Sequence, residues 1–283
     1  MGGPPLSRDA GEGHRSAAEP PEQTHRWAAG IEYLGGRYGG WQAQQDRASV
    51  QAELEAALSS VADHPVRTQA AGRTDAGVHA FGQVVHFDSS SPRSVYAWVL
   101  GTNSRLPPDV SVRWVREVPA DFSARHSAFM RSYRYVIHNH RARSALLAER
   151  ASWITPALDA AAMHRAAQAL LGERDFSAYR AAECQSSTPM RNVESITVFR
   201  RDDFVVMDIR ANAFLHHMVR NIMGVLLEIG QARRAESWAG EVLEGRDRSR
   251  GGMTAPGQGL YFMGPEYPER FGLPGPAQPW FPA

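Results

Sequence analysis

The sequence predicts an α+β protein built from two ferredoxin-like halves. Some short apolar runs alternate with polar residues, as in strands, and others recur every three or four positions, as in helices. These runs follow the order β-α-β-β-α-β twice along the chain, although the two halves show no sequence identity to each other. With 283 residues, 43% of them hydrophobic, the chain is long enough to give each half a core.

In the first half, Ser49 precedes a helix whose residues Val50, Leu54 and Val61 share one face, so its hydroxyl is expected to cap the first turn. The loop 35–40 is rich in glycine but lacks the spacing of a phosphate-binding loop, which argues against a nucleotide fold. The predicted elements of this half are strands at 27–33, 66–70, 83–87 and 110–118 and helices at 50–61 and 94–103.

The second half repeats this order, with a hairpin that is expected to turn at Asp202 and Asp203. Its predicted elements are strands at 131–139, 193–199, 204–210 and 260–263 and helices at 159–171 and 216–229. For the domain organisation we expect a disordered tail at 1–25, an N-terminal half at 26–127, a C-terminal half at 128–271 and a Pro-rich extended tail at 272–283.

Composition limits the classes of function. No run approaches the roughly 18 consecutive apolar residues of a membrane span, and the first 25 residues contain no apolar core segment of a secretory signal, so we expect a cytoplasmic location. The only cysteine, Cys184, excludes an internal disulfide and a cysteine-rich metal site. All 31 basic residues are arginines, whose side chains suit phosphates and bases, but the complete absence of lysine favours a compositional bias of the source genome.

The segment Gly72-Arg73-Thr74-Asp75-Ala76-Gly77-Val78-His79-Ala80 is the most informative part of the sequence. It places one carboxylate between two glycines, which can adopt backbone angles closed to other residues, and just before a predicted strand. A carboxylate that is ionised at neutral pH can act as a nucleophile without a partner base. On local chemistry alone, a simple turn in which Arg73 pairs with Asp75 on the surface is the more common outcome.

The full segment resembles the active-site motif of the tRNA pseudouridine synthase A family. The resemblance covers residues 26–271 and continues through further motifs in the same order, namely Gly30-Ile31-Glu32-Tyr33, Gly40-Trp41-Gln42, Phe122-Ser123-Ala124-Arg125, Tyr133-Arg134-Tyr135, Arg191-Asn192-Val193, Ala211-Asn212-Ala213-Phe214 and His216-His217-Met218-Val219-Arg220-Asn221. It implies the pseudouridine synthase fold, in which two ferredoxin-like halves form a mostly antiparallel mixed sheet with helices on one side and a central RNA-binding cleft on the other. In this family the residue at the position of Asp75 is the catalytic nucleophile.

Tyr133 lies in an alternating strand, where core packing is the plain expectation for a tyrosine and is what we predict for Tyr135. By resemblance, Tyr133 instead stacks on the target base, which suits a nucleotide flipped out of its helix. In the closing segment 254–260, the resemblance implies that Leu260 packs beside the base; without it, the segment reads as a turn into an edge strand.

On the predicted helix 216–229, the residues His217, Arg220, Asn221 and Gly224 form a polar stripe on an otherwise apolar surface. A surface stripe is the simplest explanation, but the resemblance implies that Arg220 holds the carboxylate of Asp75. We predict that His216 and His217 contact RNA or are structural, and that they bind no metal, because adjacent residues on a helix point in different directions and no third ligand is evident.

The implied reaction is the isomerisation of uridine at positions 38, 39 and 40 of the tRNA anticodon stem-loop by a homodimer, with Arg73, Arg220 and His217 among the RNA-binding residues. Since no atoms are gained, we expect no cofactor and no metal. Asp75 would attack the sugar carbon, attack C6 of the base or assist a glycal route. One competing class is a glycosidase or nucleosidase, which usually needs a second carboxylate; another is a noncatalytic RNA-binding module, whose aromatic strand signature is absent.

Overall fold

The structure, a computed structural model, describes residues 24–275 and has the predicted α+β composition. The elements of its first half are β1 (His25–Tyr33), α1 (Val50–Ala62), β2 (Gln69–Ala70), β3 (His79–Ser89), α2 (Val95–Asn103) and β4 (Val110–Val118). The predicted cap of α1 is confirmed, because the hydroxyl of Ser49 accepts a hydrogen bond of 3.3 Å from the N–H of Ala52. The predicted terminal tails lie outside the described residues, except for 24–25 and 272–275.

The second half contains three short elements that the sequence does not predict. Its elements are β5 (Met130–Asn139), β6 (Ser152–Ile154), α3 (Ala160–Ala167), β7 (Gly172–Asp175), β8 (Met190–Arg201), β9 (Phe204–Ala211), α4 (Met218–Gly230), α5 (Trp238–Gly245) and β10 (Leu260–Glu266). β6, β7 and α5 were missed because segments of three to eight residues carry too little periodicity. The predicted hairpin turn is confirmed, with Asp202 in the left-handed region at a φ of 51°.

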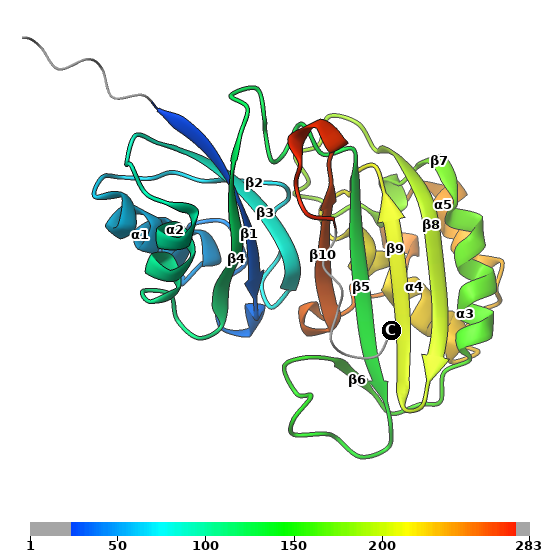
Figure 1. Ribbon diagram of the computed structural model, residues 1–283. Coiled ribbons are helices and arrows are strands. Elements are labelled where there is room, and N and C mark those ends of the chain that lie inside the picture. Colours follow the sequence, from blue (N-terminus) through cyan, green and yellow to red (C-terminus); the bar gives the residue numbers. More distant parts are fainter. Residues whose placement is uncertain (1–23, 276–283) are drawn as a thin grey trace, which may run out of the picture.

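All of the strands within residues 24–275 belong to one sheet, whose main path has the order β4-β1-β3-β10-β5-β9-β8-β7, with β2 beside β3 and β6 beside β5. The four principal strands of each half follow the ferredoxin-like order fourth, first, third, second: β4-β1-β3-β2 and β10-β5-β9-β8. Among the described pairs only β3–β10 and β5–β6 are parallel. In Figure 1, β10 lies between β3 of the first half and β5 of the second, and it joins the two halves into one mostly antiparallel sheet.

The helices of both halves cover the same face of this sheet. α1 and α2 pack on the core of the first half, which includes Phe262, and α3, α4 and α5 pack on the core of the second half, which includes Leu260. Because Leu260 and Phe262 are two residues apart on β10, they point to one face. The intervening Tyr261 points to the opposite face, where it packs against Phe81.

Tyr133 packs against both helix-covered cores, so it points to the helix-bearing face. The expectation of a cleft on the face opposite the helices is therefore wrong for the predicted site residues. They lie on the helix-bearing face, between the α1/α2 group and the α3/α4/α5 group, because the odd-numbered residues of β5 from Tyr133 to Ile137 all point to that face.

Several predicted boundaries also differ. β3 begins four residues before the predicted strand 83–87, so that His79 and Ala80 of the motif belong to the strand itself. The predicted helix 159–171 ends at Ala167 and continues as a 3-10 turn over Gln168–Leu170. α4 begins at Met218, which places both histidines of the motif before the helix.

Candidate active site

The loop that carries Asp75 is fixed by hydrogen bonds of Thr74, the residue before Asp75. The hydroxyl of Thr74 lies 2.8 Å from the hydroxyl of Tyr33, and its carbonyl accepts a hydrogen bond of 3.0 Å from the N–H of Trp41. Thr74, Tyr33 and Trp41 are all buried. The loop is thus fixed to the first half, and the Asp75 side chain projects from it with 21% of its surface exposed.

Glycine is required at one of the two motif positions. Gly77 has a φ of 78°, a left-handed conformation that favours glycine, and it is the third residue of a turn closed by the hydrogen bond from the N–H of Val78 to the carbonyl of Asp75. Gly72 has no positive φ and open space around it, so its backbone conformation does not require glycine.

Arg220 of α4 reaches the Asp75 carboxylate from the other half of the protein. Its Nη1 atom lies 3.0 Å from Oδ2 of Asp75, across 145 residues of sequence. Its Nε atom donates a hydrogen bond of 2.7 Å to the carbonyl of Ala255, whose N–H in turn bonds to the carbonyl of Arg220 at 3.1 Å. Both ends of the guanidinium are therefore fixed, and the arginine holds the carboxylate in one orientation.

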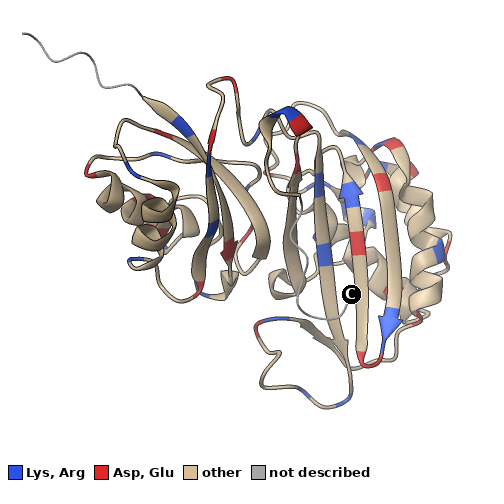
Figure 2. Ribbon diagram, in the orientation of Figure 1, with Lys and Arg blue, Asp and Glu red and all other residues tan. Residues whose placement is uncertain are grey.

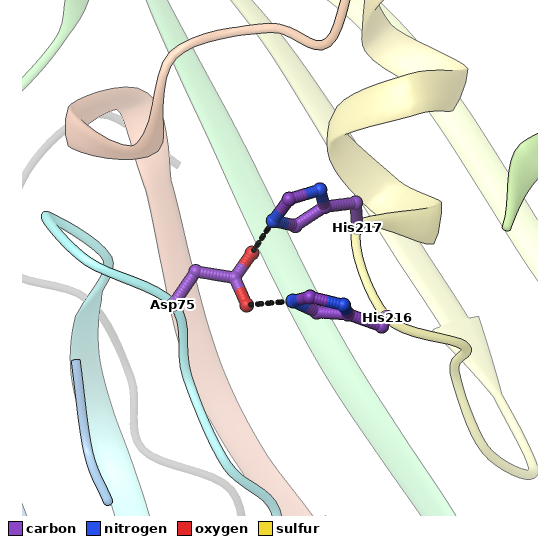
Figure 3. Close-up of side chains that lie close together, drawn as sticks. All are labelled: Asp75, His216 and His217. Carbon is purple, nitrogen blue, oxygen red and sulfur yellow. Dashed lines mark ion pairs between the residues drawn. The ribbon is translucent and has the colours of Figure 1, made fainter. Parts of the chain in front are cut away.

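His216 and His217 both face the same carboxylate, as Figure 3 shows. Their Nε2 atoms lie 3.3 Å from Oδ1 and Oδ2 of Asp75, respectively, and the ring centroids are 4.0 Å apart. The expectation that the two rings diverge is wrong, because neither residue is inside the helix. His217 occupies the N-cap of α4 with a φ of 61°, and this left-handed residue turns the chain so that adjacent rings converge.

Burial lowers the pKa of His217, while the nearby Asp75 carboxylate acts in the opposite direction. Burial also raises the pKa of Tyr133 above its ordinary value, with smaller contributions from Tyr33 and from the charge of Asp75. The Tyr133 phenol is consequently protonated at neutral pH and can donate a hydrogen bond.

Tyr133 lies between the two cores, with its ring centroid 5.0 Å from those of both Phe214 and Phe262. Tyr135, in contrast, is fully buried, and its hydroxyl bonds to Ser152 at 2.6 Å and to the carbonyl of Pro256 at 2.8 Å. The predicted core role of Tyr135 is confirmed. Tyr133 is only partly buried and near enough to Asp75 to feel its charge, which leaves it available to a ligand.

Leu260 and Arg73, the other two predicted site residues, lie in different environments. Leu260 is buried at the start of β10, next to the turn Gly257–Gly259. This turn packs closely on the Asp75 loop, since a Cβ atom on Gly257 would lie 2.4 Å from the carbonyl of Ala76. Arg73 is exposed, and within residues 24–275 it forms no ion pair. The pairing of Arg73 with Asp75 in a simple surface turn is therefore wrong: the arginine on Asp75 is Arg220.

Sequence reasoning missed Ala255 as a partner of Arg220 and Thr74 as the residue that fixes the loop. A backbone carbonyl leaves no signal in side-chain patterns, so Ala255 was not predictable from its residue type. Thr74 lies beside Asp75 in the motif, and its small hydroxyl side chain was a usable signal, since such groups often bond within loops.

A carboxylate held on a loop by an arginine from the other half, on a sheet of two ferredoxin-like units, defines the class of RNA-modifying pseudouridine synthases. The family model described as tRNA pseudouridine synthase matches residues 29–127 and 166–268. The chain belongs to this family.

Individual relatives agree. The chain is 55% identical over 252 residues, 89% of its own length and 93% of theirs, to the proteins named tRNA pseudouridine synthase A of Salmonella newport (strain SL254) and Salmonella agona (strain SL483). The expected enzyme class, an isomerase of uridine in tRNA, is thereby confirmed, and the glycosidase and the noncatalytic RNA-binding module are excluded. Within residues 24–275, no helix has the length and apolar character needed to cross a membrane.

Proposed function

We propose that this protein converts uridine to pseudouridine at positions 38, 39 and 40 of the tRNA anticodon stem-loop, with Asp75 as the nucleophile. The observation that carries the proposal is the position of the Asp75 carboxylate, which Arg220 holds at 3.0 Å while 21% of the side chain stays open to solvent. The relatives named tRNA pseudouridine synthase A, at 55% identity, support the choice of substrate.

In the reaction, the bond between N1 of uracil and the sugar carbon breaks, the base turns, and C5 bonds to the same carbon. The proton on C5 leaves and N1 gains one, so atoms and electrons balance without a cofactor. Asp75 attacks the sugar carbon, attacks C6 or assists a glycal route, and in each case it must be an ionised carboxylate. The guanidinium of Arg220 lies 3.0 Å from Oδ2 of this carboxylate and is paired with it.

The target uridine must leave its stack before it can react, which costs roughly a few kcal/mol. Tyr133, which lies partly exposed beside Phe214 and Phe262, offers an aromatic face that offsets this cost by stacking on the base. By the family resemblance, Leu260 and His217 also contact the base, and the exposed Arg73 contacts phosphate.

We further propose that the enzyme works as a cytoplasmic homodimer, with each tRNA spanning both subunits. The family resemblance supports this assembly. Sedimentation equilibrium of the purified protein, with and without tRNA, tests it: a monomer that modifies tRNA at full rate would contradict the homodimer.

The test of the function is Asp75→Asn, which preserves size and removes the charge. With unmodified tRNA, pseudouridine in the anticodon arm should be lost while the affinity for tRNA stays near that of the wild type. Asp203→Asn, in the exposed hairpin turn, is the matched control and should keep full activity. Pseudouridine formation by the Asp75→Asn protein would overturn the role of Asp75, and release of free uracil by the wild type would overturn the isomerisation.

A further inference from the structure

Asp75, His216 and His217 form the only group of three potential metal ligands within residues 24–275. One ligand atom from each of the three residues can be chosen so that all lie within 4.8 Å of one another. Nε2 of His216 lies 3.3 Å from Oδ1 of Asp75, and Nε2 of His217 lies 3.3 Å from Oδ2. Zinc bound tetrahedrally at about 2.0–2.1 Å from its ligands keeps neighbouring ligand atoms about 3.3 Å apart. Each histidine nitrogen is thus at this separation from one oxygen of the same carboxylate, and the three side chains lie close enough to share one ion (Figure 3).

The types of ligand select the ion. Two imidazole nitrogens and one carboxylate oxygen are typical of zinc sites that keep an open position for water. Imidazole also suits Co²⁺ and Ni²⁺, whereas Mg²⁺ prefers oxygen ligands and retains its waters. The side chains of His216, His217 and Asp75 are 40%, 28% and 21% exposed, which leaves the group accessible to a hydrated ion.

Arg220 limits how tightly such an ion is held. Its Nη1 atom lies 3.0 Å from Oδ2 of Asp75, so a bound dication has a positive charge nearby. Oδ1 of Asp75, which faces His216, remains available to a metal ion while Arg220 stays bonded to Oδ2. The site is thus weaker than that of a dedicated zinc enzyme, and it can release its metal.

We propose that Asp75, His216 and His217 bind a divalent transition metal such as Zn²⁺, and that this ion inhibits the enzyme reversibly. Metal binding itself rests on the geometry alone, whereas inhibition also rests on the proposed role of Asp75. A metal-bound carboxylate is a weaker nucleophile because the cation withdraws electron density from it, and the ion occupies the space next to it. The enzyme is then active in its metal-free form and is switched off by transition metals.

The first experiment measures binding without RNA. Full-length protein without a histidine tag is titrated with Co²⁺, whose visible absorption reports nitrogen coordination, and Zn²⁺ is then added to displace it. The wild type should bind one Co²⁺ per chain. His216→Ala, His217→Asn and Asp75→Asn should each weaken binding by roughly tenfold or more. Asn tolerates the left-handed conformation of residue 217, which protects the fold of that variant.

His126→Ala, which removes an exposed histidine outside the cluster, is the matched control and should bind Co²⁺ like the wild type. Melting temperatures of all variants separate loss of a ligand from loss of the fold. Equal Co²⁺ affinity of the wild type and of folded His216→Ala and His217→Asn would overturn the proposal, and so would a complete lack of binding by the wild type.

The second experiment measures pseudouridine formation with added Zn²⁺, with added Mg²⁺ and with a chelator. Zn²⁺ should inhibit, the chelator should restore the rate, and Mg²⁺ should have no inhibitory effect. Activity in the chelator with no effect of Zn²⁺ would refute the inhibition and leave the proposed function intact. Absence of pseudouridine in every condition, with Co²⁺ still bound, would refute the proposed function and leave the metal site intact.

Discussion

The ring of His79 joins the Asp75 loop region to the turn before β10, because its Nε2 atom lies 3.1 Å from the carbonyl of Gln258. The N–H of Gly35 donates to Nδ1 at 2.9 Å, so the neutral ring must carry its proton on Nε2 and donate it to Gln258. The ring also stacks on Tyr261 at 4.6 Å. One neutral histidine therefore connects three segments of the chain.

This arrangement predicts a pH dependence of stability. Burial lowers the pKa of His79 to about 4, and Arg150 acts in the same direction. Between about pH 6.5 and pH 4 the unfolded chain binds a proton at this residue that the folded chain does not, so the free energy of unfolding falls as the pH falls. The total loss is about 3 kcal/mol. Denaturant unfolding of the wild type and of His79→Gln across this range measures it; an equal slope in both proteins would contradict the prediction.

Arg220→Lys should reduce the rate of pseudouridine formation by roughly 10- to 100-fold, the cost of about 1.5–3 kcal/mol for a lost hydrogen bond to a charged group. Lysine keeps the charge but lacks the planar fork that contacts Asp75 and Ala255 together. Single-turnover rates on unmodified tRNA provide the measurement. Arg165→Lys, in an exposed ion pair with Glu236, is the control, and an unchanged rate for Arg220→Lys would show that charge alone is sufficient.

Gly224→Ala should destabilise the protein by about 1–3 kcal/mol. A Cβ atom on Gly224 of α4 would lie 1.8 Å from the carbonyl of Met253, so the segment that carries Ala255 must move. The rate should fall together with the melting temperature, because Ala255 fixes Arg220. Gly240→Ala in α5 is the matched control, since the nearest atom outside its own helix, on Ala169, lies at an ordinary 3.5 Å. It should be neutral or stabilising.

Tyr133→Phe should leave the melting temperature unchanged, because the ring keeps its contacts with Phe214 and Phe262. Tyr133→Leu removes the aromatic face and should lose much more activity than the Phe variant. A rate for Tyr133→Leu equal to that of Tyr133→Phe would exclude stacking on the base. Thermal melting of both proteins shows how much of any loss is due to packing.

Arg134 and Arg141 should respond differently to charge reversal. Arg134 is buried and pairs with Asp208 of β9 through two hydrogen bonds of 2.7 and 2.8 Å. Figure 2 shows a basic segment of β5 beside the acidic segment of β9. Arg134 points away from Tyr133, so we expect no contact between Arg134 and RNA. Arg134→Glu should lower stability, whereas the exposed Arg141→Glu should flatten the dependence of tRNA affinity on salt. An unchanged salt slope for Arg141→Glu would place the RNA elsewhere.

Much of the fold follows from periodicity in the sequence. The β-α-β-β-α-β order and the cap at Ser49 are visible as apolar patterns and residue types. Periodicity failed at His217, because a single left-handed residue makes the helix begin at Met218, two residues later than the pattern indicates, and turns both histidines toward Asp75. Backbone conformation at one residue has no periodic signal.

The contact between Asp75 and Arg220 was expected from the family resemblance and not from spacing, since the two residues are 145 positions apart. Tertiary pairing at this separation depends on which strands become neighbours. The alternation of β5 predicted that Tyr133 and Tyr135 share a face, but it did not reveal that this face carries the helices. That choice depends on the packing of whole elements.

The placement of β10 has a consequence for synthesis on the ribosome. β3 and β5 pair with β10 and not with each other, so the nascent chain carries two open sheet edges until its final strand emerges. The Asp75 loop lies in the half that contains β3, and α4 lies in the half that contains β5. A chain that terminates before Leu260 therefore lacks the strand that joins the two halves and brings Asp75 and Arg220 together. Such a chain also presents unpaired strand edges to chaperones or to other copies of itself.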